Sequence, residues 1–305
     1  MKHDLDRRAF LQTAGALTAG TLTAGAMLLR PGRAWALPFE NKLSTPSAAK
    51  IGWDVGIEMY TFRSISLYEA LEKIEKLGVQ HVETAYFLKL DPQRPELTTS
   101  DKLTSAERKE LKQRLADHDV HMTNYYSDLN TDRDAAIRTF EFAKEMGVQT
   151  IVAEPVAEAF DMLEPLCDKY AINLAIHNHP KSAESKYWHP DNVMAVCKGR
   201  SKRIGGCCDT GHWVRSGLKP IDCLKIMQGR IISFHLKDVA EWANPGARDV
   251  PLGQGLADYA AVLKELKSQG FRGLMSIEYE HESPQLVDDV AECVAFVEKT
   301  AAQLQ

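Results

Sequence analysis

The sequence predicts an α/β fold of the (β/α)8 or TIM barrel type, and three observations support this. Short apolar runs alternate with longer amphipathic segments throughout residues 51–305. Such alternation is typical of βαβ units that form a parallel sheet. Eight repeats can be counted, and eight close most naturally into a barrel. The region also has the length of a single TIM barrel, which is roughly 250 residues.

The elements follow in order, and glycines or capping residues set several of their ends. The first helix is amphipathic and stops at Gly78, and a longer connection rich in Pro, Asp and Thr leads to a helix that begins at a Ser cap, Ser105. Later helices stop at Gly147 and Gly270. Strands are expected at residues 53–62, 79–84, 120–126, 148–154, 172–179, 204–209, 231–237 and 273–280. Helices are expected at residues 67–77, 105–117, 131–146, 159–170, 190–198, 221–227, 259–268 and 286–303.

The N-terminal region has the composition of a targeting segment. Arg7-Arg8 belongs to a twin-arginine pattern, a weakly apolar run rich in Ala, Thr and Gly follows, and Ala34-Trp35-Ala36 is an A-x-A-like cleavage site. We expect a twin-arginine signal peptide at residues 1–36, a linker at 37–50 and the barrel domain at 51–305. The apolar run is too short and too rich in Gly and Thr for a stable membrane span. The chain is therefore expected to use the Tat translocase, without stable membrane insertion afterwards, and to be periplasmic or extracellular.

Charge and cysteine content narrow the function class. The net charge of −5 comes without a basic stripe, so the sequence does not predict nucleic-acid binding. The six cysteines fall inside predicted helices and a buried strand, without the spacing of a small disulfide scaffold. We expect free, buried thiols.

Four predicted strands end in a residue that can bind a metal ion. These residues are Glu154, Asp209, His235 and Glu278. In a TIM barrel the carboxyl ends of the strands form the active-site face, so the four side chains are expected to meet there. Three carboxylates and one imidazole suit Mn²⁺, Mg²⁺ or Co²⁺. The sequence therefore predicts one divalent metal ion at this face.

Such a site favours proton transfer at a carbon next to a carbonyl group. Glu154 and Glu278 are expected on opposite sides of the barrel, where one can act as base and the other as acid. Glu58 and Glu83 are expected to be salt-bridge partners within the barrel. Four further residues near the strand ends are candidates for substrate binding, namely His177, His179, His212 and Lys237. Six aromatic residues are candidates for the wall of a sugar pocket, namely Trp53, Tyr60, Phe62, Trp188, Trp213 and Trp242.

Several motifs together resemble the xylose isomerase-like TIM barrels, which are also called the sugar phosphate isomerase/epimerase family. The motifs are Gly56 to Phe62, Ala153-Glu154-Pro155, His177-Asn178-His179, Asp209-Thr210-Gly211-His212, His235-Leu236-Lys237-Asp238, Pro251 to Gly255 and Ile277-Glu278. They run from the first predicted strand to the last. As a set they are typical of the superfamily, and none is typical of one activity.

The resemblance implies the metal site Glu154, Asp209, His235 and Glu278, with manganese, cobalt or magnesium bound. In the ketose 3-epimerases of this family the two glutamates also exchange the substrate proton. A histidine after the aspartate and an arginine after the metal-binding histidine hold the substrate there. The matching residues are His212 and, with a less regular spacing, Arg248.

We expect a metal-dependent sugar isomerase or epimerase that works through a metal-stabilised enediolate. The expected substrate is a non-phosphorylated sugar or keto-sugar, because the expected location is periplasmic or extracellular and no phosphate cradle is recognised. One alternative is a 3-keto-glycoside lyase or hydratase that uses the same metal site, with His177 or His179 protonating the leaving group. An alternative of another class is a non-catalytic sugar-binding barrel. Homo-oligomers remain possible.

Overall fold

The computed structural model describes residues 43–305. The predicted signal peptide (residues 1–36) and the first six residues of the predicted linker lie outside the described residues. The end of that linker, Pro46–Lys50, forms the helix α1. The carboxylate of Glu298 accepts hydrogen bonds from the backbone N–H groups of Ser47 and Ala48, at 2.9–3.1 Å. Residues 46–50 are thus attached to the barrel.

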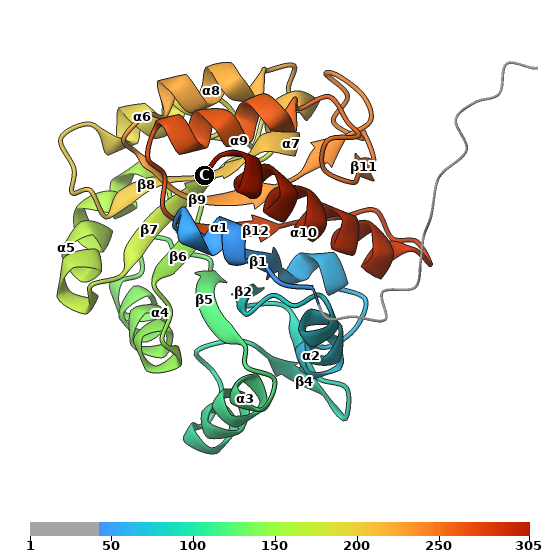
Figure 1. Cartoon of the computed structure of the whole chain (residues 1–305). Helices are drawn as coiled ribbons and strands as arrows, with labels where there is room; N and C mark the ends of the chain where they lie inside the picture. The colour runs from blue at the N-terminus through green and yellow to red at the C-terminus, as the bar shows by residue number, and fades with distance from the viewer. Residues whose placement is uncertain (1–42) are drawn as a thin grey trace, which may run out of the picture. The chain divides into compact units, whose positions relative to one another are not determined.

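Eight parallel strands close into a barrel, which confirms the predicted fold class. The order around the barrel is β1, β12, β9, β8, β7, β6, β5, β2, and β2 pairs again with β1. The helices surround these strands (Figure 1). The barrel strands are β1 (Trp53–Glu58), β2 (His81–Ala85), β5 (His121–Tyr126), β6 (Thr150–Ala153), β7 (Asn173–His177), β8 (Ile204–Asp209), β9 (Ile231–Leu236) and β12 (Gly273–Ile277).

All eight predicted helices are present, with shifts of a few residues at their ends. Capping boxes begin two of them, at Ser66 with Glu69 and at Thr104 with Glu107. The helices are α2 (Leu67–Lys76), α3 (Ser105–Asp117), α4 (Arg133–Met146), α5 (Phe160–Tyr170), α6 (Pro190–Cys197), α8 (Pro220–Ile226), α9 (Tyr259–Ser268) and α10 (Leu286–Gln303). None of the helices among residues 43–305 is long and apolar enough to cross a membrane.

The first strand is shorter than predicted. It ends at Glu58, and Met59–Phe62 forms the 3-10 helix η1. The side chain of Glu58 caps this helix, because its Oε2 accepts a hydrogen bond from the backbone N–H of Tyr60 at 2.7 Å. A second short 3-10 helix, η2 (Ala157–Ala159), precedes α5.

The long connection after β2 contains a hairpin that the sequence did not predict. Strands β3 (Lys89–Asp91) and β4 (Arg94–Thr98) pair antiparallel. Asp91 holds the turn, since Oδ1 accepts from the Gln93 N–H and Oδ2 pairs with Arg94, which also contacts Glu110 in α3. The hairpin is thereby joined to the next helix.

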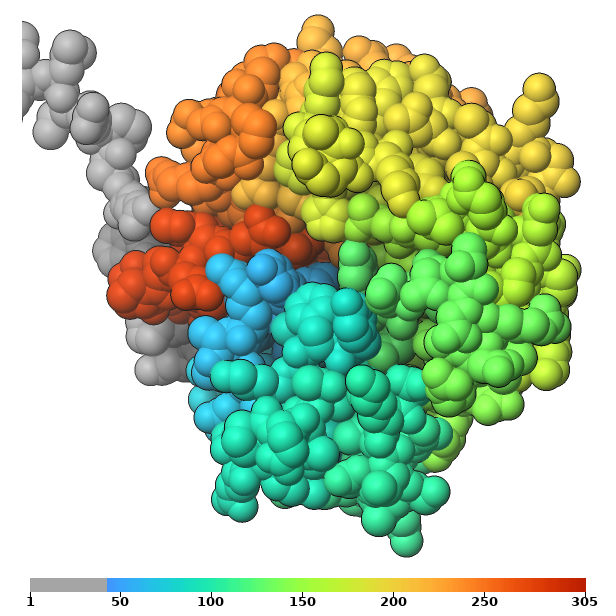
Figure 2. Space-filling model, turned by 180° about the vertical axis from the view of Figure 1, so that it is seen from behind, coloured from blue at the N-terminus to red at the C-terminus, as the bar shows by residue number. Residues whose placement is uncertain are grey.

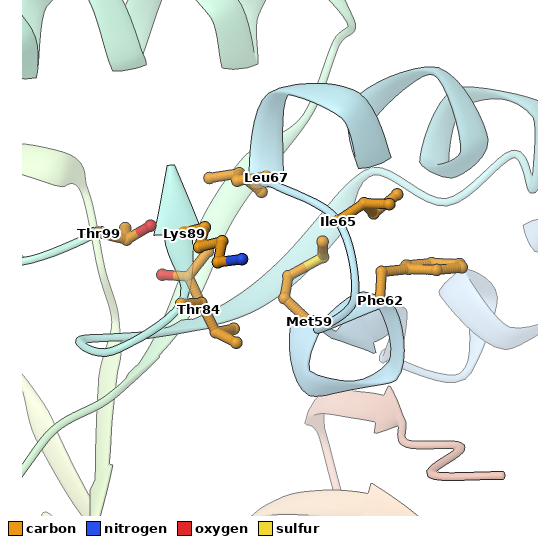
Figure 3. Close-up of a pocket in the computed structure, with 8 residues that line it drawn as sticks. Met59, Phe62, Ile65, Leu67, Thr84, Lys89 and Thr99 are labelled. Atoms are coloured by element: carbon orange, nitrogen blue, oxygen red, sulfur yellow. The ribbon is translucent and has the colours of Figure 1, made fainter. Parts of the chain in front are cut away.

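A hollow of about 10 Å³ lies between η1 and this hairpin (Figure 3). Its lining includes the hydroxyl-bearing side chains of Thr84 and Thr99, whose buried Oγ1 atoms have no partner among the described residues. That volume can hold about one water molecule and no substrate.

Three further short elements lie between β8 and β12. The short helix α7 (Thr210–Arg215) begins directly at the end of β8, and β10 (Asp238–Val239) pairs with β11 (Asp249–Val250) after β9. All six cysteines are free and buried, as predicted. Val152, Ala175 and Cys207 form a separate small cluster of buried residues. These three residues come from adjacent barrel strands.

Candidate functional site

The ends of the barrel strands surround one cavity of about 250 Å³. Figure 2 shows a hollow between the blue, cyan, green and red-orange segments, which supply most of its lining. The lining residues are Glu58, Tyr60, Ala85, Phe87, Tyr126, His177, His179, His235, Glu278 and Glu280. One side of the cavity is therefore acidic and histidine-rich, and another is aromatic.

Four buried side chains, three of which line this cavity, could bind one metal ion. His177, Asp209, His235 and Glu278 each offer a ligand atom, and these atoms all lie within 4.8 Å of one another. Three of the four predicted metal ligands, Asp209, His235 and Glu278, are thus brought together. The fourth position in this group belongs to His177.

Glu154 lies on the other side of His177. It forms a separate group with His177 and His179, and its Oε1 accepts hydrogen bonds from Tyr126 (2.8 Å) and lies 2.7 Å from His179 Nδ1. The His177 ring separates the two groups, with Nδ1 3.7 Å from Glu154 and Nε2 3.8 Å from Asp209. The structure therefore does not place Glu154 in the same group as the other three predicted ligands.

The buried atoms of the four-residue group fit a cation. Both nitrogens of His177, Oδ2 of Asp209, Nδ1 of His235 and Oε2 of Glu278 are buried without a hydrogen bond among the described residues. Lys237 Nζ lies within 3.1 Å of both carboxylate oxygens, but the two nitrogens of His177 have no close partner, and buried polar atoms are rarely left unpaired. Carboxylate oxygens and imidazole nitrogens together are suitable ligands for Mn²⁺, Co²⁺ or Zn²⁺.

The surroundings of His235 show most clearly that the four-residue group needs a proton or a metal ion between its atoms. Its Nε2 lies 2.8 Å from Oε1 of Glu83, a carboxylate that can only accept a hydrogen bond. If Nε2 carries the hydrogen, Nδ1 points a lone pair at Glu278 Oε2, which lies 2.9 Å away. Two acceptors at this distance repel unless a proton or a metal ion lies between them. Burial opposes a charge on the ring, but Cys207, Glu83 and Glu278 raise the pKa of His235 well above its ordinary value.

The expectation that Glu83 pairs within the barrel is confirmed, because Glu83 pairs with His235 and orients its ring. Carboxylates that hold the second nitrogen of a metal-binding histidine are common. Glu58 differs from the expectation, since it lines the cavity and caps η1. Burial, reinforced by the charge of Glu278, raises the pKa of Glu58 well above its ordinary value.

Hydrogen bonds hold both the side chain and the backbone of Asp209 in place. Its Oδ1 caps α7 by accepting from the backbone N–H of His212 at 2.8 Å. Its own backbone N–H and C=O bond to the side-chain amide of Asn178, at 2.9 and 3.0 Å. Oδ2 is therefore left for the base of the cavity. The Asp-Thr-Gly-His motif therefore consists of the last residue of β8 and the first residues of α7.

Lys237 is completely buried and does not line the cavity. Its Nζ lies 3.0 Å from Asp209 Oδ2, 3.1 Å from Glu278 Oε2 and 3.2 Å from Glu280 Oε1. Burial disfavours the ammonium charge, but Asp209, Glu278 and Glu280 raise its pKa well above the ordinary value. Lys237 therefore pairs with the carboxylates without lining the cavity. It does not lie where the sequence predicted a contact with the substrate.

Gly211 allows the Lys237 side chain to pass close to α7. A Cβ atom at that position would lie 2.5 Å from Cγ of Lys237, much closer than real Cβ contacts. The lysine side chain therefore passes α7 only where the helix carries a glycine.

His212 and the predicted arginine lie differently from expectation. His212 is buried beside Asp209 and Lys237, and burial lowers its pKa well below the ordinary value. Arg248 is exposed. The arginine near the site is Arg215, which lies one helical turn after His212 and contacts its Nδ1 at 3.2 Å. Its guanidinium also pairs with Glu280 and Asp249, each at 2.7 Å.

Among the six aromatic candidates, only Tyr60 lines the cavity. Trp53 and Trp213 are buried in the core. The other aromatic lining residues, Phe87 and Tyr126, were not singled out from the sequence. Phe87 falls in the connection after β2, and Tyr126 is the last residue of its strand.

Comparison with known proteins places this geometry in a family. Residues 71–299 match the family model described as xylose isomerase-like TIM barrel. The rhizopine catabolism protein MocC of Rhizobium meliloti is 27% identical over 139 residues, which cover 41% of this chain and 42% of MocC. An inosose dehydratase of Clostridium botulinum (strain Alaska E43 / Type E3) is 26% identical over 142 residues, 42% of this chain and 47% of the relative. The chain thus matches less than half the length of each of these two curated relatives.

Solved structures share the fold over most of the chain. An uncharacterized protein from Parabacteroides distasonis ATCC 8503 is 31% identical, with a TM-score of 0.65 over 81% of this chain and 98% of that one. An L-ribulose 3-epimerase has 14% identity and a TM-score of 0.63 (82% and 95% covered), and the IolI protein, whose structure contains a zinc atom, has 22% and 0.58 (82% and 97% covered). The last two likenesses show the fold alone. The family match over most of the chain and the closed parallel barrel show that the chain belongs to the xylose isomerase-like TIM barrel family.

Proposed function

We propose that this protein is a divalent-metal-dependent isomerase or epimerase that transfers a proton at a carbon next to the carbonyl of a non-phosphorylated sugar or keto-sugar. The relatives with a named activity are enzymes, which supports an enzymatic role. The observation that carries the proposal is the convergence of buried ligand atoms from His177, Asp209, His235 and Glu278 beside a cavity.

Asp209, His235 and Glu278 would hold the metal ion, with His177 Nε2 as the fourth ligand in this geometry. Manganese, cobalt and magnesium are the proposed occupants, and zinc is added by its presence in IolI. A bound divalent ion polarises a carbonyl oxygen and makes the neighbouring C–H more acidic.

The side chains around the cavity can then move the proton. Glu278 lines the cavity, and His235 and Lys237 engage its Oε2, which leaves Oε1 as the base. Glu154 contributes through His179. Because Glu154 accepts from Nδ1, a neutral His179 ring presents the lone pair of Nε2, which can accept a hydrogen bond from a substrate hydroxyl. Glu58 is a second carboxyl group on the cavity wall.

The cavity disfavours a phosphorylated substrate. Its lining residues include three glutamates and no lysine or arginine. The glycine-bearing loop after β11 is also not a phosphate cradle, because its backbone N–H groups are already occupied. The carboxylate of Asp238 accepts from Gly253 (2.9 Å), Gly255 (3.0 Å) and Ala257 (3.0 Å).

A second candidate is a 3-keto-glycoside lyase or hydratase with the same proton-abstraction step. The match to an inosose dehydratase favours it, because dehydration also begins with loss of a proton next to a carbonyl. His179 lies on the cavity wall, where Nε2, once it has taken up a proton, would donate that proton to the leaving group.

The test is solvent exchange with the purified protein in D₂O. Candidate free sugars, keto-sugars and 3-keto-glycosides are incubated with protein that has been treated with EDTA and then loaded with Mn²⁺. The proposal predicts deuterium at the carbon next to the carbonyl and a rearranged sugar, both only with metal. Release of the C1 substituent would instead favour the lyase. Binding of sugars without exchange under any metal condition would favour a non-catalytic sugar-binding barrel.

We also propose export by the Tat translocase to the periplasm or beyond. The basis is Arg7-Arg8 followed by the weakly apolar run and Ala34-Trp35-Ala36. Residues 1–42 fused to a fluorescent protein should reach the periplasm, and the same fusion with both arginines changed to lysine should stay in the cytoplasm. Equal localisation of the two fusions would contradict export by this route.

A further inference from the structure

An aromatic surface continues from the cavity to the outside of the barrel. Phe87 lines the cavity and yet keeps 45% of its surface exposed, and Tyr86 beside it is 38% exposed. Large aromatic side chains at the mouth of a cavity often mark a ligand-binding surface. We call Tyr60, Tyr86, Phe87 and Tyr126 the aromatic rim.

The aromatic rim is a fixed surface. The Phe87 ring meets the rings of Tyr60, Tyr86 and Tyr126 edge to face, with centroids 6.2, 5.2 and 6.3 Å apart. The backbone N–H of Tyr86 bonds to the carbonyl of Tyr126 at 3.1 Å, and the neighbouring Leu88 is buried. The rim is therefore held in place by η1, by the segment after β2 and by the end of β5, and Phe87 stays partly exposed.

The size of the cavity limits what can fit inside it. Its volume of about 250 Å³ lies below the roughly 300–1,000 Å³ of pockets that enclose drug-sized ligands. One monosaccharide ring fits beside the histidines and glutamates. A substituent on that ring has to leave the cavity, and Phe87 is the large hydrophobic lining residue that is exposed at the outside.

We infer that the aromatic rim binds a second ring attached to the substrate, so that the substrate is a keto-glycoside, a glycoside whose keto-bearing sugar ring lies in the cavity. The flat apolar face of a phenyl or sugar ring would stack on the exposed part of Phe87 and Tyr86. The identity of the first ring as a sugar rests on the proposed function. The position of the second ring rests on the rim alone.

The test compares two probes that differ in their second ring. Binding of phenyl β-D-glucopyranoside and methyl β-D-glucopyranoside to the full chain with Mn²⁺ is measured by titration calorimetry. Stacking predicts that the phenyl glucoside binds about tenfold more tightly. In Phe87→Ala and in Phe87→Leu, which keeps most of the bulk, this ratio should fall to about one to twofold. Trp242→Ala is the matched control, because Trp242 is 43% exposed and does not line the cavity.

Three results would overturn the inference. These are equal affinities of the two probes for the unaltered protein, an unchanged ratio in both Phe87 variants, and no binding of either probe at millimolar concentration. Failure of the proposed function would look different. Proton exchange would then be absent with every substrate, while the phenyl preference and its dependence on Phe87 would persist.

Discussion

At the scale of single residues, Lys237 brings a positive charge to the oxygens that a divalent cation would use. Its Nζ contacts Asp209 Oδ2 and Glu278 Oε2, which belong to the four-residue group that could bind a metal ion. The ammonium group and a metal ion therefore share the same negative charge. Lys237 stabilises the carboxylates when no metal is bound and reduces the attraction for the metal.

Lys237→Met should consequently bind divalent metal more tightly, by about tenfold or more, because a competing charge is gone. The same variant without metal should lose several kcal/mol of unfolding free energy, because removing one partner of a buried ion pair leaves carboxylates uncompensated. Titration calorimetry with Mn²⁺ and thermal unfolding with and without EDTA measure both effects.

Lys225→Met is the control, because Lys225 is exposed. It should change neither quantity measurably. Weaker Mn²⁺ binding by Lys237→Met than by the unaltered protein would contradict the competition between Lys237 and the metal.

At the scale of elements, Arg215 joins α7 to two segments that follow other barrel strands, one after β9 and one after β12. Its guanidinium pairs with Asp249 in β11 and Glu280 after β12, and it also donates to the carbonyl of Ala247. Arg215→Met leaves Asp249 without its charge partner and removes one of the two that Glu280 has. We expect about 3–5 kcal/mol lower unfolding free energy, measured by urea denaturation.

Arg248→Met is the matched control, since Arg248 is exposed and close in sequence to the same loop. Its stability should stay within about 0.5 kcal/mol of the unaltered protein. Equal stability of the two variants would refute a structural role for Arg215. Loss of sugar binding in Arg248→Met alone would restore the prediction that Arg248 holds the substrate.

The β3–β4 hairpin should show an acid-dependent stability. The backbone N–H of Gln93, followed by Arg94, lowers the pKa of Asp91 below its ordinary value of 3.8. Because the folded pKa is lowered, the unfolded chain binds more protons in this range, and the contribution is present above pH 3.8 and lost as the pH falls below it. Asp91→Asn should cost about 1 kcal/mol at pH 7 through the lost ion pair with Arg94.

Thermal unfolding of both proteins at pH 7, 5 and 3.5 tests this sign. The difference between them should be constant from pH 7 to 5 and smaller at pH 3.5. A difference that grows on acidification would contradict the lowered pKa of Asp91.

The sequence predicted most elements because each repeat carries its own local signals. Apolar strands, capping residues and stopping glycines such as Gly147 are read without knowledge of neighbours. The elements η1 and α7, which the sequence did not predict, also have local causes. The Glu58 side chain converts the end of the first predicted strand into η1, and Asp209 begins α7 in a stretch for which no helix was predicted.

At the scale of the whole molecule, strand ends alone predicted Asp209, His235 and Glu278 at one point, because all barrel strands are parallel. The separation of Glu154 by His177 depends on how side chains from neighbouring strands β6 and β7 fill the mouth. Phe87 and Arg215 were missed for a similar reason, since their roles depend on partners more than thirty residues away. Spacing along the chain cannot reveal such partners.

The most direct test of the account is a crystal structure of the protein grown with Mn²⁺, with anomalous diffraction recorded to locate the metal. We predict one anomalous peak per chain, within about 2.5 Å of oxygens of Asp209 and Glu278 and a nitrogen of His235. The same map will show whether His177 or Glu154 completes the site. No peak at millimolar Mn²⁺, or a peak bound by other residues, would contradict the proposed metal centre.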